Sequence, residues 1–90
     1  MLFLYSFFFH IFTGMDHRVS YIEDILKEEF NEWHHKYMFF NIKDGAINIT
    51  YTVPKTFPSG GVMFRRTARK RLEDFGLVQG VDFTISIEFI

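Results

Sequence analysis

Residues 55–71 of this sequence contain six basic residues and no acidic residue. Residues 1–54 carry a net charge of −3 and residues 72–90 a net charge of −4, so the formal net charge of −1 conceals a segregated distribution. Clustered Lys and Arg side chains attract phosphate groups, and this chemistry favours nucleic acid as a ligand. The six candidate nucleic-acid-binding residues are Lys55, Arg65, Arg66, Arg69, Lys70 and Arg71.

A helix is predicted over residues 62–75, with Gly76 as its C-terminal cap, and it would carry five of these cations. At roughly 100° per residue, an apolar stripe lies beside a continuous basic arc. The stripe holds Phe64, Ala68, Leu72 and Phe75, and the arc holds Arg65, Arg66, Arg69 and Lys70. The preceding loop ends in Gly60-Gly61, and the helix N-terminus there would offer free backbone N–H groups to phosphate.

Two other interpretations of the basic arc stay open. It can be a solvated helix face, with Arg65 and Arg69 paired to an acidic first helix or to Glu73 and Asp74. It can also dock on an acidic protein surface, or the chain can offer an edge of its own sheet for strand addition by a protein partner. The sequence favours a small non-enzymatic regulator that binds nucleic acid, RNA more than DNA. The alternative is an inhibitor or adaptor that binds an acidic protein.

Residues 60–70, Gly60-Gly61-Val62-Met63-Phe64-Arg65-Arg66-Thr67-Ala68-Arg69-Lys70, locally resemble the last helix of double-stranded RNA-binding domains. In that family, basic pairs around an alanine follow a glycine-containing loop and contact phosphates, so the resemblance implies RNA as the ligand. The family has three strands between its helices and ends on this helix. Here two strands are predicted between the helices and another follows, so the chain is assigned to no family. Residues 46–53 also lack the aromatic and basic-glycine signature of an RNA recognition motif.

Catalytic chemistry finds little support in the residue types. The chain has no cysteine, which excludes disulfides, a thiolate nucleophile and every cysteine-containing metal site. His34 and His35 are adjacent, so on a helix their side chains point about 100° apart and cannot share one metal ion. No H-E-x-x-H spacing, nucleophile elbow or Walker loop is present. The sequence therefore predicts neither enzyme activity nor a cofactor.

The clearest structural signal is a β-hairpin. Residues 37–43 and 46–53 are rich in β-forming residues and flank Asp44-Gly45, a preferred pair for a two-residue type I′ turn. Such a turn pairs Lys43 with Ala46 and, counting outward, residue 38 with residue 51. One face of the hairpin is then apolar and the other is mostly polar.

Two further elements complete a small α+β domain. Residues 16–36 have apolar side chains at helical spacing, and residues 81–90 alternate apolar and polar side chains as a half-buried strand does. The order α-β-β-α-β predicts a two-layer sandwich with two helices on one face of a mostly antiparallel sheet. We expect residues 15–90 to form this single domain. The order becomes β-α-β-β-α-β, a ferredoxin-like plan, if residues 2–12 form a strand.

Residues 1–14 form an aromatic segment, which is either an extra strand or an upstream extension of a reading frame that starts at Met15. Ser6 and His10 break its apolar run, which is too short for a membrane span, and it lacks the basic start of a signal peptide. These features predict a cytoplasmic protein without a membrane span. The Phe-rich composition is typical of an AT-rich genome, such as that of a phage. The aromatic segment also allows self-association, so the sequence leaves the oligomeric state open.

Overall fold

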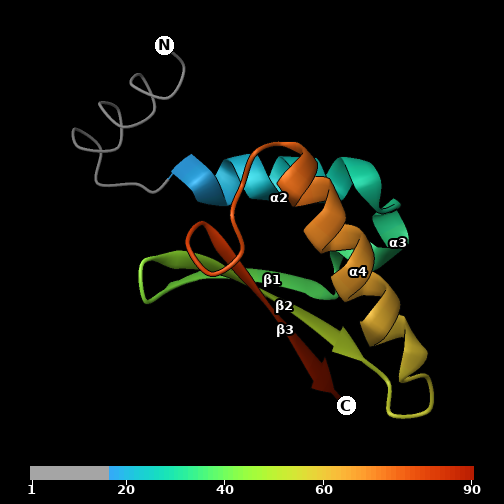
Figure 1. The fold of residues 1–90 in the computed structure, drawn as a ribbon. Coiled ribbons are helices and arrows are strands. Elements are labelled where there is room, and N and C mark those ends of the chain that lie inside the picture. Colours follow the sequence, from blue (N-terminus) through green and yellow to red (C-terminus); the bar gives the residue numbers. More distant parts are fainter. Residues whose placement is uncertain (1–16) are drawn as a thin grey trace.

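The computed structural model describes residues 17–90, which form three helices and one sheet. In chain order the elements are α2 (His17–Glu29), α3 (Glu32–His35), β1 (Met38–Lys43), β2 (Ala46–Val53), α4 (Ser59–Asp74) and β3 (Phe83–Phe89). Both long helices, α2 and α4, lie on the same side of the sheet (Figure 1). The predicted two-layer α+β arrangement is confirmed for these residues. The strand considered for residues 2–12 lies outside the described part of the chain.

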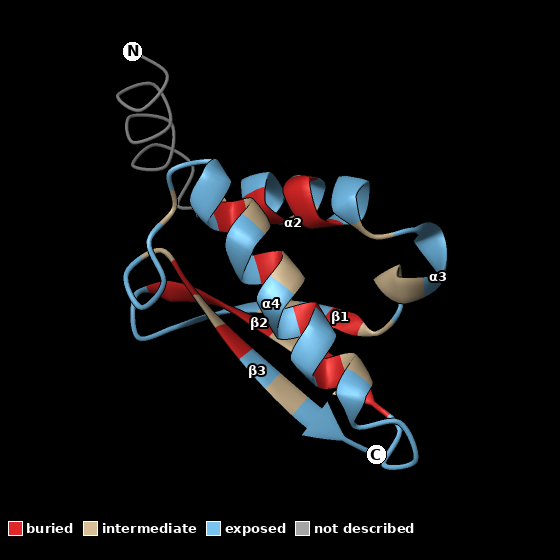
Figure 2. Cartoon of the chain, turned by 45° about the vertical axis from the view of Figure 1, so that its right-hand side comes forward, coloured by how far each residue is buried: buried red, intermediate tan, exposed pale blue. Residues whose placement is uncertain are grey.

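The hairpin has the predicted register. Asp44 and Gly45 both have positive φ, 54° and 82°, as a type I′ turn requires. β1 pairs antiparallel with β2 from Lys43 opposite Ala46 onward, and every later pair agrees with that start. β2 is the central strand of the sheet, and it is buried along most of its length (Figure 2).

The sheet is mixed, whereas the sequence predicted mostly antiparallel pairing. β3 pairs parallel with β2, from Ile47 opposite Phe83 to Val53 opposite Phe89. α4 is the cause, because its 16 residues return the chain along the sheet and β3 then starts at the same end as β2. Since β2 and β3 pair directly, no strand lies between them, and β3 forms one edge of the sheet that residues 17–90 build.

The single helix predicted over residues 16–36 is two helices. α2 ends at Glu29, and Asn31 begins α3 as its N-cap, with φ −70°, ψ 166° and an Oδ1 atom that accepts the Trp33 N–H at 3.0 Å. His35 Nε2 lies 3.0 Å from the carbonyl oxygen of Lys27, so its ring N–H can donate to the last turn of α2. Periodicity could not reveal this break, because the apolar residues on both sides of it keep helical spacing.

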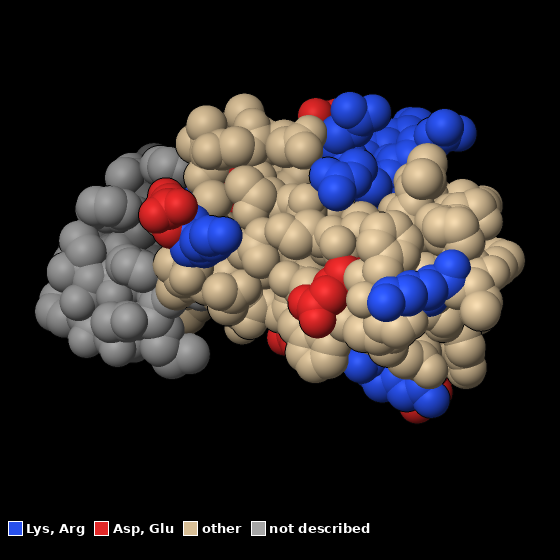
Figure 3. Space-filling model, turned by 90° about the horizontal axis from the view of Figure 1, so that it is seen from below, with Lys and Arg blue, Asp and Glu red and all other residues tan. Residues whose placement is uncertain are grey.

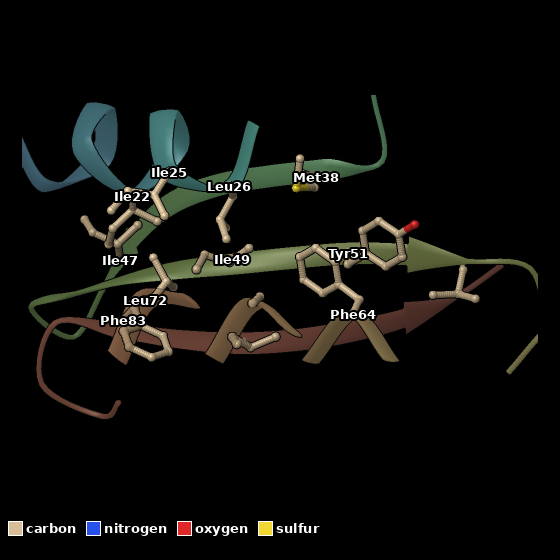
Figure 4. Packing of buried hydrophobic residues seen from close by; sticks show 13 residues of the cluster. Ile22, Ile25, Leu26, Met38, Ile47, Ile49, Tyr51, Phe64, Leu72 and Phe83 are labelled. Atoms are coloured by element: carbon tan, nitrogen blue, oxygen red, sulfur yellow. The ribbon is translucent and has the colours of Figure 1, made fainter. Parts of the chain in front are cut away.

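The core fills the space between the helices and the sheet. Three side chains of α2 point toward the strands, and α4 adds a second apolar row (Figure 4). Burial of each such side chain contributes about 1.5–3 kcal/mol, which makes this layer the main source of stability. The largest side chains with almost no exposure are Phe83, Ile22, Leu26, Ile47, Ile49, Leu72 and Val53.

Candidate nucleic-acid interface

The apolar stripe of α4 decides which way its basic residues face. Phe64, Ala68 and Leu72 are buried against the sheet, as the stripe predicted, although Phe75 is 46% exposed. The Phe64 ring stacks on the ring of Tyr51 with centroids 4.1 Å apart (Figure 4). Because one side of the helix is held against the core, the opposite side must carry the basic arc into solvent.

Gly60 and Gly61 lie inside the first turn of α4, which begins at Ser59, three residues earlier than predicted. The Gly60 N–H donates to the Phe57 carbonyl and the Gly61 N–H to the Pro58 carbonyl, both at 3.2 Å. These N–H groups are therefore not free for phosphate, and that expectation was wrong. The structure gives Gly61 a different role, because its lack of a side chain lets the helix approach the sheet.

Close packing explains Gly61. A Cβ atom at this position would lie 2.6 Å from Cγ2 of Ile87, far inside van der Waals contact. Gly61 thus allows α4 to lie directly against β3. The first turn of α4 is a packing contact with the sheet.

Arg66, Arg69 and Lys70 form the most accessible group of candidate residues. All three are exposed, and neither Arg66 nor Arg69 has an ion-pair or hydrogen-bond partner among residues 17–90. Lys70 Nζ lies 3.6 Å from Asp74 Oδ2, an exposed pair of a kind that is weak in water. Figure 3 shows a patch of basic side chains at one margin of the molecule, apart from the other basic groups in that view.

Arg71 is partly withdrawn from the surface. It is half-buried, its Cζ lies 5.2 Å from the centroid of the Phe75 ring, and its Nε is buried without a hydrogen-bond partner among the described residues. The helix ends beside it as predicted, with Gly76 at φ 85° and the Leu77 N–H bonded to the Leu72 carbonyl. Arg71 therefore contributes less accessible charge than its neighbours.

Arg65 and Lys55 stand apart from this group. Arg65 is exposed, but its Nη1 donates to the carbonyl oxygen of Ile85 on β3 at 3.1 Å. Lys55 lies in the loop before α4, and the first residue of that helix is about 16 Å from Lys70 along the helix axis at 1.5 Å per residue. The interpretation that Arg65 pairs with a carboxylate is wrong within the described residues, since its partner is a backbone oxygen.

A shallow depression of about 320 Å³ adjoins the accessible group. The cations share its lining with carboxylates, so a phosphate placed in the depression would meet both signs of charge. The outward ridge of α4 is the better place for a polyanion. The lining residues are Glu29, Arg66, Thr67, Lys70, Arg71 and Asp74.

The face of the sheet opposite α2 and α4 carries a polar network that the sequence did not predict. Asn48 is only 8% exposed, and its Oδ1 accepts from Thr84 Oγ1 at 2.8 Å and from Ser86 Oγ at 3.1 Å. Its Nδ2 donates to Thr50 Oγ1 at 3.1 Å and to Asn41 Oδ1 at 3.4 Å. The only sequence signal was polar alternation in strands whose neighbours were not yet known. Because the amide is fully used inside the sheet, Asn48 has a structural role.

His34 and His35 have structural partners. His34 Nδ1 lies 2.8 Å from Tyr51 Oη, and burial raises the pKa of this tyrosine, with a smaller contribution from Tyr37. Within the described residues, no group of three His, Asp or Glu side chains could hold a metal ion. None of the helices over residues 17–90 is long and apolar enough to cross a membrane.

Compared with known proteins, the chain matches no protein-family model, no curated protein and no solved structure. The two strands between α2 and α4, and the strand after α4, also differ from the plan of double-stranded RNA-binding domains. Support for a function must come from the geometry and charge of α4.

Proposed function

We propose that this protein is a small non-enzymatic regulator that binds nucleic acid through the outward face of α4. The observation that carries the proposal is the group of Arg66, Arg69 and Lys70, all exposed, with Arg66 and Arg69 unpaired among the described residues. Residues three and four apart on a helix are neighbours, so these like charges repel one another. Phosphate binding would relieve this repulsion and release counterions.

RNA is the preferred ligand in this proposal. The preference rests on the local resemblance of residues 60–70 to the last helix of double-stranded RNA-binding domains. Arg66 and Arg69 can each form two parallel hydrogen bonds to a phosphate, whereas Lys70 acts as a point charge. The depression beside these residues is shallow, which favours contacts with the phosphate backbone over insertion of a single base. A cytoplasmic location would follow from such a ligand.

Binding of the full 90-residue chain to labelled single-stranded RNA, duplex RNA and duplex DNA at two salt concentrations tests the proposal. The triple variant Arg66→Ala, Arg69→Ala and Lys70→Ala should lose most of its affinity, and the salt slope should fall by up to about 3.

A matched control removes the same charge elsewhere. The exposed side chains of Lys27, Lys36 and Lys43 lie on α2, after α3 and on β1. Replacing these three by alanine should leave binding nearly unchanged, because the phosphates lie along α4. Equal losses in the two triple variants would mean that net charge alone governs binding, and unchanged affinity in the α4 variant would contradict the proposal.

An acidic protein surface is the second candidate ligand. Val62 and Met63, on the first turns of α4, are 60% and 64% exposed. Apolar side chains beside cations suit a protein interface better than a phosphate backbone. Capture of partners from a lysate with and without nuclease separates the two candidates. A complex lost with the nucleic acid supports the first, and a protein complex that survives nuclease and needs Met63 supports the second.

A further inference from the structure

β3 presents a row of backbone groups at the edge of the sheet. The Ile47 N–H donates to the Asp82 carbonyl at 3.0 Å and the Ile90 N–H to the Val53 carbonyl at 2.9 Å, so residues 82 and 90 direct their backbone groups toward β2. Successive residues of a strand direct their backbone N–H and C=O groups to opposite sides. Every second residue between positions 82 and 90 therefore directs these groups away from β2. These outward-facing residues are Phe83, Ile85, Ile87 and Phe89.

Two donors already cover the first half of this edge. The Gly80 N–H donates to the Phe83 carbonyl at 2.7 Å, and Arg65 Nη1 donates to the Ile85 carbonyl at 3.1 Å. No group within residues 17–90 bonds the outward backbone atoms of Ile87 or Phe89. Arg65 therefore marks the boundary between the covered and the open part of the edge.

We propose that Arg65 closes the β3 edge against strand addition by a second copy of this chain. In an antiparallel pair with Ile87 on the two-fold axis, Ile85 of one copy faces Phe89 of the other, and Ser86 faces Glu88. Glu88 of one copy therefore does not face Glu88 of the other copy in the new pair of strands. The Ile85 carbonyl must accept the Phe89 N–H of the other copy, and the Arg65 guanidinium already donates to that oxygen.

The side chains of this edge favour a second copy as the excluded strand. Phe89 and Ile90 are 47% and 63% exposed, and pairing of two β3 strands would bury apolar surface of both copies. Natural proteins place charged side chains on such edges to prevent this association. The inference concerns the oligomeric state, and it holds whether or not α4 binds nucleic acid.

Light scattering of the full chain over a range of concentrations tests the role of Arg65. Arg65→Met keeps the aliphatic stem and removes every donor, and Arg69→Met is the matched control, since Arg69 has no partner among the described residues. The mass of Arg65→Met should rise to about twice that of the wild type, as an isologous dimer requires. Arg69→Met should match the wild type. Equal masses for the two variants across the range would overturn the proposal.

Hydrogen exchange then locates the contact. The Ile87 and Phe89 amides should exchange rapidly in the wild type and become protected in Arg65→Met, while the outward amides of Phe40 and Ile42 on β1 stay unchanged. A rise in mass with protection at β1 alone would also overturn the proposal. If circular dichroism shows that Arg65→Met is unfolded, Arg65→Gln replaces it, because the shorter side chain loses the same contact and should show the same rise in mass.

Discussion

Phe64 of α4 and Tyr51 of β2 stack with ring centroids 4.1 Å apart and an angle of 3° between their planes. Phe30, just after α2, stacks on Phe64 at 4.9 Å, and the Tyr51 hydroxyl lies 2.8 Å from Nδ1 of His34 in α3. This aromatic cluster joins α3, α4 and the segment just after α2 to the central strand. The basic face of α4 is therefore presented by a helix that is anchored in the core.

Removal of the Phe64 ring should destabilise the fold strongly. Phe64 is 3% exposed, so Phe64→Ala should lower the free energy of unfolding by about 3–5 kcal/mol through lost burial and a cavity. Phe75→Ala is the control on the same helix, because this ring is 46% exposed and should cost much less. Urea unfolding measures both values. Equal losses would contradict the anchoring role of the Phe64 stack.

Stability should depend on Tyr51 at alkaline pH. Burial raises the pKa of this hydroxyl above its usual value of about 10, so the unfolded chain loses the proton at a lower pH than the folded chain. The contribution of Tyr51 to stability is therefore fully present below about pH 10 and is lost as the pH rises further. In urea unfolding at several pH values, the wild type should lose stability more steeply than Tyr51→Phe above that pH. If the free energy of unfolding fell equally with pH in the wild type and in Tyr51→Phe, the Tyr51 hydroxyl would not be the cause.

The approach of α4 to β3 should tolerate no side chain at Gly61. Gly61→Ala places a methyl group 2.6 Å from Ile87 Cγ2 and should cost about 1–3 kcal/mol through overpacking. Ile87→Ala makes room for that methyl group, so the two substitutions together should cost less than the sum of their separate effects. A double-mutant cycle by urea unfolding checks this coupling. If the two losses of stability simply added, the contact between residues 61 and 87 would not limit the packing of α4 on β3.

Asp74 should weaken nucleic-acid binding by α4. Its carboxylate lies 3.6 Å from Lys70 Nζ and competes with phosphate for that cation. Asp74→Ala should raise the affinity about two- to fivefold, in keeping with the small energy of exposed ion pairs. Asp24→Ala changes the net charge equally on the exposed side of α2 and should have a smaller effect. Equal gains in titrations of labelled RNA would point to net charge alone.

Local signals in the sequence predicted the hairpin and the end of α4. Asp44-Gly45 specifies a type I′ turn because both residues tolerate positive φ, and a two-residue loop leaves one register for the strands beside it. Gly76 likewise ends a helix that has its own apolar stripe. These features depend on residues close together in the chain, so no tertiary contact was needed to predict them.

Other features of the fold depend on distant contacts. The chain breaks its first helix at Asn31, where the cap places Phe30 and His34 against the core. Asn48 belongs to the mostly polar face of the hairpin, but a parallel β3 beside β2 covers it with Thr84 and supplies two of its hydrogen bonds. Neither result follows from periodicity, because periodicity describes one segment and not its neighbour in space.

The candidate site was likewise predictable from the sequence only in part. The sequence alone determined that six cations gather in residues 55–71 and that a single helix carries five of them. Only the tertiary structure decided which of them contact other parts of the fold, because the exposed Arg65 reaches the edge of β3 and Arg71 lies over Phe75. Charge is a property of each residue type, whereas accessibility depends on the elements that fold against it.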